Sequence, residues 1–204
     1  WYRGMPLLNH LEEVHIASDR NLIDARFPVQ YVIRPHTAEH HDYRGYAGQV
    51  ASGTYKPGDE VVVLPSGFTS RIESIDTADG PVDEAAPPMS VTIRLADDLD
   101  VSRGDMICRP NNRPHVGQDV DAMVCWFSDR AALQPGAKYA IKHTSRWARA
   151  MVRDLNYRLD VNTLHRDEAA DRLGLNEIGR VRLRTTAPLL ADEYRRNRTT
   201  GGFI

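Results

Sequence analysis

One stretch of the chain has a glycine spacing that could serve nucleotide chemistry. Residues 45–67 read GYAGQVASGTYKPGDEVVVLPSG, in which Gly48 and Gly53 stand at the Gly-x-x-x-x-Gly spacing of a phosphate-binding loop. Such a loop needs Lys and then Ser or Thr directly after the second glycine, to reach the phosphates and Mg²⁺. Here Gly53 is followed by Thr-Tyr-Lys-Pro, and the proline cannot sit inside a continuing helix. The glycines therefore predict turns between strands and not a nucleotide site.

The other clusters of reactive side chains do not assemble an active site. His36 and His40 stand at i and i+4, which on a helix could hold zinc, but the preceding Pro and the Gly- and Tyr-rich sequence after them predict an exposed loop. The carboxylate pairs Asp83-Glu84 and Asp97-Asp98 lie beside turn signals, and no nucleophile elbow occurs. We expect no catalytic, cofactor-binding or metal-binding residue in this chain, and the role of the His36–His41 loop stays open.

Arginines form the sharpest candidate interaction surface. The candidate interface residues are Arg180, Arg182, Arg184, Arg195, Arg196 and Arg198. The first three alternate with Val181 and Leu183, so in a strand they share one face while the two apolar residues point inward. Guanidinium groups bind carboxylate and phosphate well. An ordinary solvated strand face is the alternative interpretation.

Charge is distributed unevenly along the 204 residues. The formal net charge is −2, yet residues 138–204 carry 14 Lys and Arg against 8 Asp and Glu, and residues 1–137 carry 12 against 20. A basic C-terminal third is compatible with a nucleic acid or an acidic protein as partner. A contact with an acidic neighbouring domain of the same chain is the other interpretation.

Composition indicates a soluble globular protein, with 41% hydrophobic and 26% charged residues. No run of 18 apolar residues occurs, so no transmembrane helix is expected. Cys108 and Cys125 lie in apolar stretches without a metal or redox spacing, which predicts buried reduced thiols and a cytoplasmic protein. Trp126, Phe127 and Trp147 are expected to pack in the core or between domains.

Short β-rich runs separated by Gly and Pro turn signals occupy most of the chain. The expected strands are residues 27–33, 48–52, 60–64, 69–76, 90–95, 106–108, 119–127, 138–143, 148–157 and 179–185. The strands at 48–52 and 60–64 are expected to form an antiparallel hairpin about a Lys56–Asp59 turn, with positive φ at Gly58. Residues 6–14 predict a short amphipathic helix, and Arg166–Leu173 predicts a helical turn.

The predicted architecture is mainly β, with two consecutive antiparallel β-barrels after a short N-terminal helix. We expect a helical tail and connector over residues 1–24, a first barrel over 25–113 and a second barrel over 114–204, with the boundary at the Pro- and Asn-rich run Arg109–Pro114. The N-terminus lacks an initiator Met, and the C-terminus reads as the start of a strand. We therefore expect a piece of a longer polypeptide whose second barrel is truncated at its C-terminal end.

A series of short motifs resembles one known family in both content and order. The matching runs are Trp1-Tyr2, Pro6-Leu7-Leu8, Val32-x-Arg34-Pro35, Asp42-Tyr43-Arg44-Gly45-Tyr46-Ala47-Gly48, Val62-Val63-Leu64-Pro65-Ser66-Gly67, Lys142-His143-Thr144, Leu175-Asn176-Glu177-Ile178-Gly179 and Asn197-Arg198-x-Thr200-Gly201-Gly202-Phe203-Ile204. The chain thus resembles domains two and three of the elongation-factor-Tu class of GTPases. Within that class it resembles the large, GTP-binding subunit of bacterial sulfate adenylyltransferase (ATP sulfurylase).

The resemblance implies a non-catalytic barrel region within an enzyme of sulfate assimilation. In that family, GTP hydrolysis drives synthesis of adenosine 5′-phosphosulfate from ATP and sulfate. The implied partners are an N-terminal GTPase domain, which holds GTP and Mg²⁺, a small adenylyl-transferring subunit and, in fused members, a C-terminal adenylylsulfate kinase. The chain alone is expected to be inactive, to bind neither GTP nor ATP, and to contact no membrane.

Two rival interpretations remain open at this point. The basic C-terminal third would suit a translation-factor barrel pair that binds charged transfer RNA, although the motif series makes a nucleic-acid partner the less favoured reading. The other is a stand-alone carbohydrate- or oligonucleotide-binding β-module, which is disfavoured because both chain ends resemble internal segments of a longer polypeptide.

Overall fold

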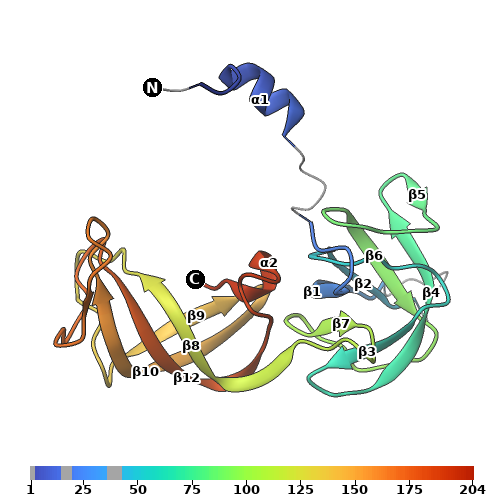
Figure 1. Ribbon diagram of the computed structural model, residues 1–204. Coiled ribbons are helices and arrows are strands. Elements are labelled where there is room, and N and C mark those ends of the chain that lie inside the picture. Colours follow the sequence, from blue (N-terminus) through green and yellow to red (C-terminus); the bar gives the residue numbers. More distant parts are fainter. Residues whose placement is uncertain (1–2, 15–19, 36–42) are drawn as a thin grey trace.

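The computed structural model describes residues 3–14, 20–35 and 43–204. Figure 1 shows two β domains side by side and a short helix, α1 (Leu7–Glu13), that stands apart from both. The histidine loop His36–His41, on which the zinc alternative depended, lies outside the described residues.

The first domain is a closed antiparallel barrel. Its strands are β1 (Arg26–Ile33), β2 (Gly45–Gln49), β3 (Glu60–Leu64), β4 (Thr69–Thr77), β5 (Gly80–Pro81), β6 (Ser90–Leu95) and β7 (Met106–Cys108). Strand pairing runs β1-β2-β6-β4-β3-β7, and β7 pairs back with β1, which closes the ring. The short strand β5 extends from β4. The predicted barrel is therefore confirmed for this half of the chain.

The expected hairpin between residues 48–52 and 60–64 is wrong. Strand β2 pairs with β1 and β6, whereas β3 pairs with β4 and β7. The reason lies in the residues between them, because the amide of Ala51 donates to the Arg26 carbonyl and that of Arg26 to the Ser52 carbonyl, each at 2.9 Å. The segment after β2 is thus held against the start of β1. The predicted turn itself is present, with φ +90° at Gly58.

Strand β3 shows why its Val-Val-Val-Leu run does not alternate with polar residues. Val61 and Val63 belong to the barrel core, while Val62 and Leu64 face the second domain, where they pack with Leu190. Strand β7 follows the same rule, since Ile107 lies in the barrel core and Met106 and Cys108 join the second cluster. A strand covered on both faces reads as a continuous apolar run. The two domains therefore bury a shared apolar patch.

The second domain is built on one antiparallel sheet. Its strands are β8 (His115–Cys125), β9 (Lys138–His143), β10 (Arg146–Leu159), β11 (Arg166–Asp167) and β12 (Ile178–Ala191), followed by the short helix α2 (Arg198–Gly201). Strand β12 lies between β8 and β10, and β9 and β11 both pair with β10. At the outer edge of β9, Lys142 and Ile204 exchange backbone hydrogen bonds of 2.6 and 2.9 Å.

Three smaller expectations for this domain are wrong. The helical turn expected at Arg166–Leu173 is replaced by β11, which pairs with the end of β10 and is tied by an Arg158–Asp167 ion pair of 2.9 Å. Cys108 is buried as expected, but Cys125 is exposed at the end of the edge strand β8. Trp126 packs against the core, whereas Phe127 and Trp147 are 75% and 62% exposed because they face outward.

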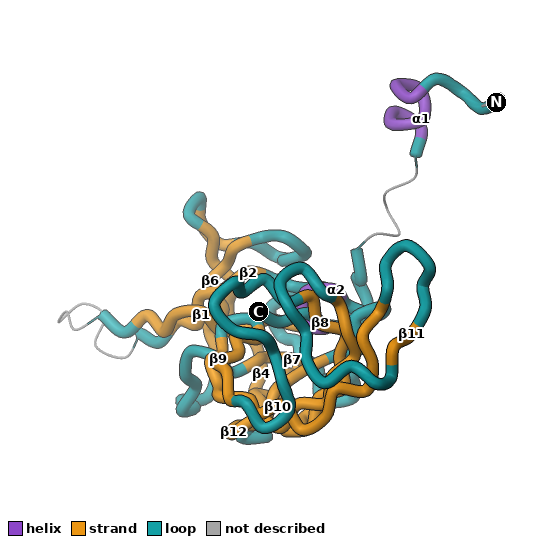
Figure 2. Tube along the Cα trace, turned by 90° about the vertical axis from the view of Figure 1, so that its left-hand side faces the viewer, coloured by secondary structure: helices purple, strands orange, loops and turns teal. Residues whose placement is uncertain are grey.

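Helix α1 buries none of its residues. Leu7, Leu8 and Leu11 are 72%, 66% and 61% exposed, and Figures 1 and 2 both show the helix standing away from the barrels. The amphipathic helix is therefore present as predicted, and its apolar side covers no other element in the described part of the chain. Neither helix in the described residues has the length or the apolar run that crossing a bilayer requires.

Candidate functional site

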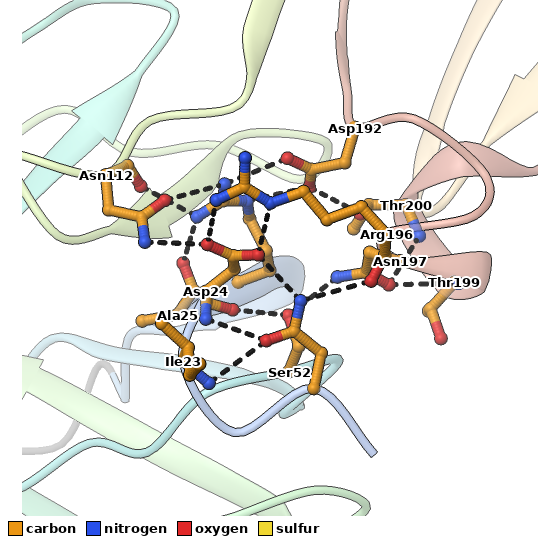
Figure 3. A network of polar contacts seen from close by, with 12 residues as sticks. Ile23, Asp24, Ala25, Ser52, Asn112, Asp192, Arg196, Asn197, Thr199 and Thr200 are labelled. Carbon is orange, nitrogen blue, oxygen red and sulfur yellow. Dashed lines mark hydrogen bonds and ion pairs between the residues drawn. The ribbon is translucent and has the colours of Figure 1, made fainter. Parts of the chain in front are cut away.

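The two domains meet across a set of polar side chains, most of them buried or half-buried, shown in Figure 3. We call this set the interdomain network; it consists of Asn21, Asp24, Arg26, Ser52, Asn112, Asp192, Arg196, Asn197 and Thr200. Its members come from the connector before β1, from the first barrel, from the β7–β8 linker and from the chain after β12. Segments far apart in sequence are thus joined at one place.

An ion pair between Arg26 and Asp192 lies at the centre of the network. Two guanidinium nitrogens of Arg26 donate to the two carboxylate oxygens of Asp192 at 2.8 and 2.9 Å, and the side chains are 1% and 6% exposed. The third guanidinium nitrogen donates to the carbonyls of Ala25 and Asn112. A buried charge of this kind is tolerated only when it is paired and fully hydrogen-bonded. The geometry meets that condition.

Asp24 forms a second charged contact beside the first. Its carboxylate accepts two hydrogen bonds of 2.6 Å from Arg196 and one of 2.7 Å each from Asn21 and Asn112. The hydrogen bonds from Arg196 are the main reason that the pKa of Asp24 lies far below its usual range, and burial opposes this only in part. Asp24 is therefore an anion in the folded protein at any physiological pH.

Neutral side chains complete the network. The Asn197 amide nitrogen donates to the Ser52 hydroxyl at 2.7 Å, and its carbonyl oxygen caps α2 by accepting from the amides of Thr199 and Thr200. The Thr200 hydroxyl donates to Asp192 at 2.7 Å, and its carbonyl contacts Nε2 of the buried His143 at 2.7 Å. Burial lowers the pKa of His143. Helix α2 is thus held between β9 and the first barrel.

Gly53, the second glycine of the phosphate-loop spacing, lies at this contact between the domains. It has φ +70°, and a Cβ there would lie 2.3 Å from the Cα of Ala25. Its amide donates to the Asn21 carbonyl at 2.7 Å. Only glycine permits this backbone approach, which places Ser52 beside Asn197. The conclusion that these glycines shape the backbone therefore agrees with the geometry.

A second polar tie lies at the start of β10. Arg146 donates to the Asp105 carboxylate at 3.1 Å, to the Gly104 carbonyl at 3.2 Å and to the Pro188 carbonyl at 3.0 Å. The Ser145 hydroxyl donates to the Val29 carbonyl at 2.7 Å and is buried. Together with the apolar patch around Leu190, these contacts and the interdomain network fix the orientation of one domain on the other.

The structure separates the six predicted interface arginines into two groups. Arg180, Arg182 and Arg184 lie on the outer face of the second sheet, and the alternating Val181 and Leu183 are buried as predicted. Acidic residues of the neighbouring strand already flank them. Arg180 donates to both carboxylate oxygens of Asp121 at 2.8 and 2.9 Å, and Arg184 pairs with Asp119. Arg182 stands opposite Asp121 on β8 and Asp154 on β10.

The other three predicted arginines lie beside the interdomain network. Arg196 is part of it, because it holds Asp24 within the same chain. Arg195 and Arg198 are exposed and line a pocket next to it. Contact of these six residues with another protein stays a prediction, and the structure shows that Arg180, Arg184 and Arg196 each have an acidic partner inside the chain.

Sequence reasoning missed the residues that join the domains. Asp24 was placed in a connector, and neither Arg26 nor Asp192 was singled out. One signal was present, since Arg26 is the single charge in the run Ala25–Val29, all of which is buried. A lone charge in such a strand indicates a buried partner. In residues 3–14, 20–35 and 43–204, no three His, Cys, Asp or Glu side chains gather as a metal ion would require.

Comparison with curated proteins finds relatives along the whole chain. A family model described as GTP-eEF1A C-terminal domain-like matches residues 119–204. The bifunctional enzyme CysN/CysC of Mycobacterium tuberculosis is 63% identical over all 204 residues, which cover 33% of that protein. Sulfate adenylyltransferase subunit 1 of Bacteroides fragilis is 45% identical over the whole chain, which covers 42% of its length. The chain thus spans between a third and just over two fifths of these relatives.

Solved structures share the arrangement of both domains. Sup35 complexed with GMPPNP superposes with a TM-score of 0.80 at 19% identity, covering 100% of this chain and 49% of that one. Translation elongation factor SelB from Methanococcus maripaludis has a TM-score of 0.68 at 17% identity, covering 91% and 39%. At such identities the likeness shows the fold alone. By sequence, the chain is a homologue of part of sulfate adenylyltransferase subunit 1 and of CysN/CysC, and by fold it is a barrel region of the elongation-factor type.

Proposed function

We propose that the chain is the non-catalytic barrel region of a sulfate adenylyltransferase GTPase subunit. In this role it couples GTP hydrolysis in a neighbouring domain to synthesis of adenosine 5′-phosphosulfate from ATP and sulfate on a partner subunit. The observation that carries the proposal is the 63% and 45% identity over the entire chain to CysN/CysC and to sulfate adenylyltransferase subunit 1.

The interdomain network supports a coupling role because it holds the two domains in a fixed relative orientation. A γ-phosphate orders or releases loops in a GTPase domain. Two domains joined through the buried Arg26–Asp192 pair would carry such a change to a distant surface without bending between them. Linkage then requires that the partner subunit change the free energy of GTP binding by the same amount as GTP changes the free energy of binding the partner subunit.

Helix α1 offers a contact for the GTPase domain in this proposal. Its exposed leucines form one apolar side, and an unburied apolar side of this kind is normally covered by another protein surface. GTP and Mg²⁺ would be held by the GTPase domain, and adenylyl transfer would occur on the small subunit. In fused proteins an adenylylsulfate kinase would follow the barrel region. The chain itself would supply no catalytic group.

The proposal can be tested in the longer protein that joins this chain to a GTPase domain, assembled with the small subunit. Arg196→Gln and Arg146→Gln each remove one interdomain tie, and Arg149→Gln removes an exposed charge that makes no such tie. We expect the number of GTP molecules hydrolysed per adenosine 5′-phosphosulfate formed to rise in the first two variants and to stay constant in the third. A constant ratio in all three, with interdomain loosening shown by hydrogen exchange, would contradict coupling through this interface.

A translation-factor barrel pair that binds charged transfer RNA is the second candidate. The match to the eEF1A-type family model and the basic residues 138–204 favour it. Against it, acidic side chains pair with two of the three arginines on the outer sheet face, which reduces the field available to phosphates. Binding of transfer RNA that weakens steeply with salt would support this candidate. No mobility shift at low salt would eliminate it.

A further inference from the structure

The chain after β12 contacts the first domain and then returns to the second. It comprises residues 192–204, and we call it the C-terminal strap. Its first residue, Asp192, binds Arg26 of the first barrel, and its last residue pairs with Lys142 of β9. Figure 1 shows helix α2 of the strap, in red, on the side of the second domain that faces the first barrel. One short segment is thus attached to both domains.

On one side the strap holds the connector that leads into the first barrel. The Arg196 guanidinium donates two hydrogen bonds of 2.6 Å to Asp24, and the Arg196 carbonyl accepts one of 3.1 Å from the Asn21 side chain. The Asn197 side chain donates to the Ser52 hydroxyl at 2.7 Å, and Figure 3 shows these groups facing one another. In the described part of the chain, each hydrogen bond between residues 21–24 and the second domain involves Arg196.

On its other side the strap is fixed to the second sheet. Nε2 of the buried His143 lies 2.7 Å from the Thr200 carbonyl. Because a carbonyl oxygen can only accept, this ring nitrogen carries the proton. Phe203 packs half-buried against the core of the second domain, and Lys142 and Ile204 exchange backbone hydrogen bonds of 2.6 and 2.9 Å. These contacts all lie on the second-domain side of the strap.

Internal contacts join the two attachments of the strap. The side chain of Asn197 accepts from two amides of α2, and the Thr200 hydroxyl donates to Asp192 at 2.7 Å. A Cβ at Gly201 would lie 2.4 Å from the Cα of Tyr194, so the strap packs backbone against backbone where it turns. A segment linked to itself in this way moves as a unit, and a displacement at one attachment reaches the other.

We propose that the strap has two states, docked on the second sheet or released from it, and that its docking controls how firmly the connector is held. Phe203 and His143 are then positioning residues, which act on Asp24 through α2 and Arg196. A segment that takes the place of Ile204 at the edge of β9 would loosen residues 21–24. Coupling between two places requires an element with two arrangements that both places bias, and the strap is that element.

The test is amide hydrogen exchange on the full chain. It needs neither GTP nor a partner subunit, so its result is independent of the coupling role proposed above. The amides of Ile23 and Asp24 donate to the Asn21 side chain and that of Gly53 to the Asn21 carbonyl, so all three report on the connector. Phe203→Ala should accelerate their exchange about tenfold or more, together with exchange of the α2 amides.

Leu155→Ala is the matched control. Leu155, like Phe203, is a half-buried apolar residue that packs against the core of the second domain, but it belongs to β10 and not to the strap. Its substitution should lower the stability of the second domain and accelerate exchange within β10 and β12. The three connector amides should keep their wild-type rates. Phe203→Leu, which retains most of the apolar contact, should accelerate connector exchange less than Phe203→Ala does.

A second pair of variants isolates the hydrogen bond to α2. His143→Gln keeps a donor for the Thr200 carbonyl, whereas His143→Leu leaves that carbonyl without one. We expect faster exchange of the connector amides in His143→Leu than in His143→Gln. Equal rates in the two variants would remove His143 from the set of positioning residues.

Three results would overturn the proposal. Equal acceleration of connector exchange by Phe203→Ala and Leu155→Ala would show a general loss of stability. Faster exchange in α2 with unchanged exchange of the connector amides would show that the strap opens without freeing residues 21–24. Unchanged exchange of α2 and of the connector, in both Phe203→Ala and His143→Leu, would show that the second sheet does not hold the strap in place.

Discussion

Arg26 and Asp192 face each other in a two-point ion pair although 166 positions separate them along the chain. Arg26 is the first residue of β1, and Asp192 directly follows β12. The pair therefore connects the beginning of one domain to the end of the other. Because both side chains are almost fully buried, the energetics of this contact decide how firmly the domains are joined.

Breaking this pair from one side should be strongly destabilising. Asp192→Ala leaves a buried guanidinium without its counter-ion, which lowers the free energy of unfolding by about 3–5 kcal/mol. Urea denaturation measures the loss. The double variant Arg26→Met with Asp192→Leu removes both charges and should recover most of it. If the single and double variants lose the same amount, the buried charge is not the source of the effect.

Asp24 should make stability sensitive to acid. Its folded-state pKa is depressed, chiefly by Arg196, so its contribution is complete above the unfolded-state pKa of about 4 and is lost as pH falls below that value. In Asp24→Asn the plot of stability against pH should be flatter below about pH 4. Asp121→Asn, which removes an exposed partner of Arg180, is the matched control and should change the plot much less. Chemical denaturation of the variants and of the wild type, in steps of about one pH unit between pH 2 and 7, checks this.

Gly53 and Gly58 both have positive φ, yet their substitution should differ in effect. A Cβ at position 53 would meet the Ala25 backbone at 2.3 Å, whereas nothing lies within 4 Å of a Cβ at position 58. Gly53→Ala should therefore lower the unfolding free energy by about 2 kcal/mol or more. Gly58→Ala should lower it by about 1 kcal/mol, from backbone conformation alone. Thermal melts of the two variants give the comparison, and an equal loss would mean that the close approach relaxes freely.

Arg182→Glu probes the outer face of the second sheet. The new carboxylate would stand between Asp121 and Asp154 and would reverse the local charge without touching the core. We expect weaker binding of the GTPase domain or the small subunit, and a melting temperature close to that of wild type. Surface plasmon resonance and a thermal melt measure the two quantities. Unchanged binding would leave the arginines of β12 as a solvated strand face.

The isolated chain should neither bind GTP or ATP nor hydrolyse either nucleotide. The phosphate-loop spacing at Gly48 and Gly53 lacks the Lys and hydroxyl residues that such a site needs, and Gly53 is committed to packing on Ala25. Fluorescent-nucleotide binding and phosphate release are the measurements. Saturable, Mg²⁺-dependent GTP turnover by the purified chain would contradict the assignment of nucleotide chemistry to another domain.

Local sequence patterns predicted the elements well and their pairing poorly. Alternation in β12 identified Val181 and Leu183 as inward-facing, and the Lys56–Asp59 turn was found from its Pro-Gly-Asp chemistry. Strand neighbours depend on contacts between distant segments, so the closed order of the first barrel was not visible. The same limit explains why Arg26 and Asp192 were missed, since neither residue carries a local sign of the other. Cys125 was misplaced because an edge strand and a buried strand can have similar compositions.

The ring of pairings in the first domain has a consequence for how other molecules can attach to it. Each of the six strands that close the ring has a hydrogen-bonded neighbour on both sides, because β7 returns to β1, and only the two-residue β5 is paired on one side. Among the described strands of the ring, no unpaired edge is left for an incoming peptide to extend. Recognition at this domain must therefore rely on side chains and loops. A single substitution there can change which partner is bound without altering the backbone of the barrel.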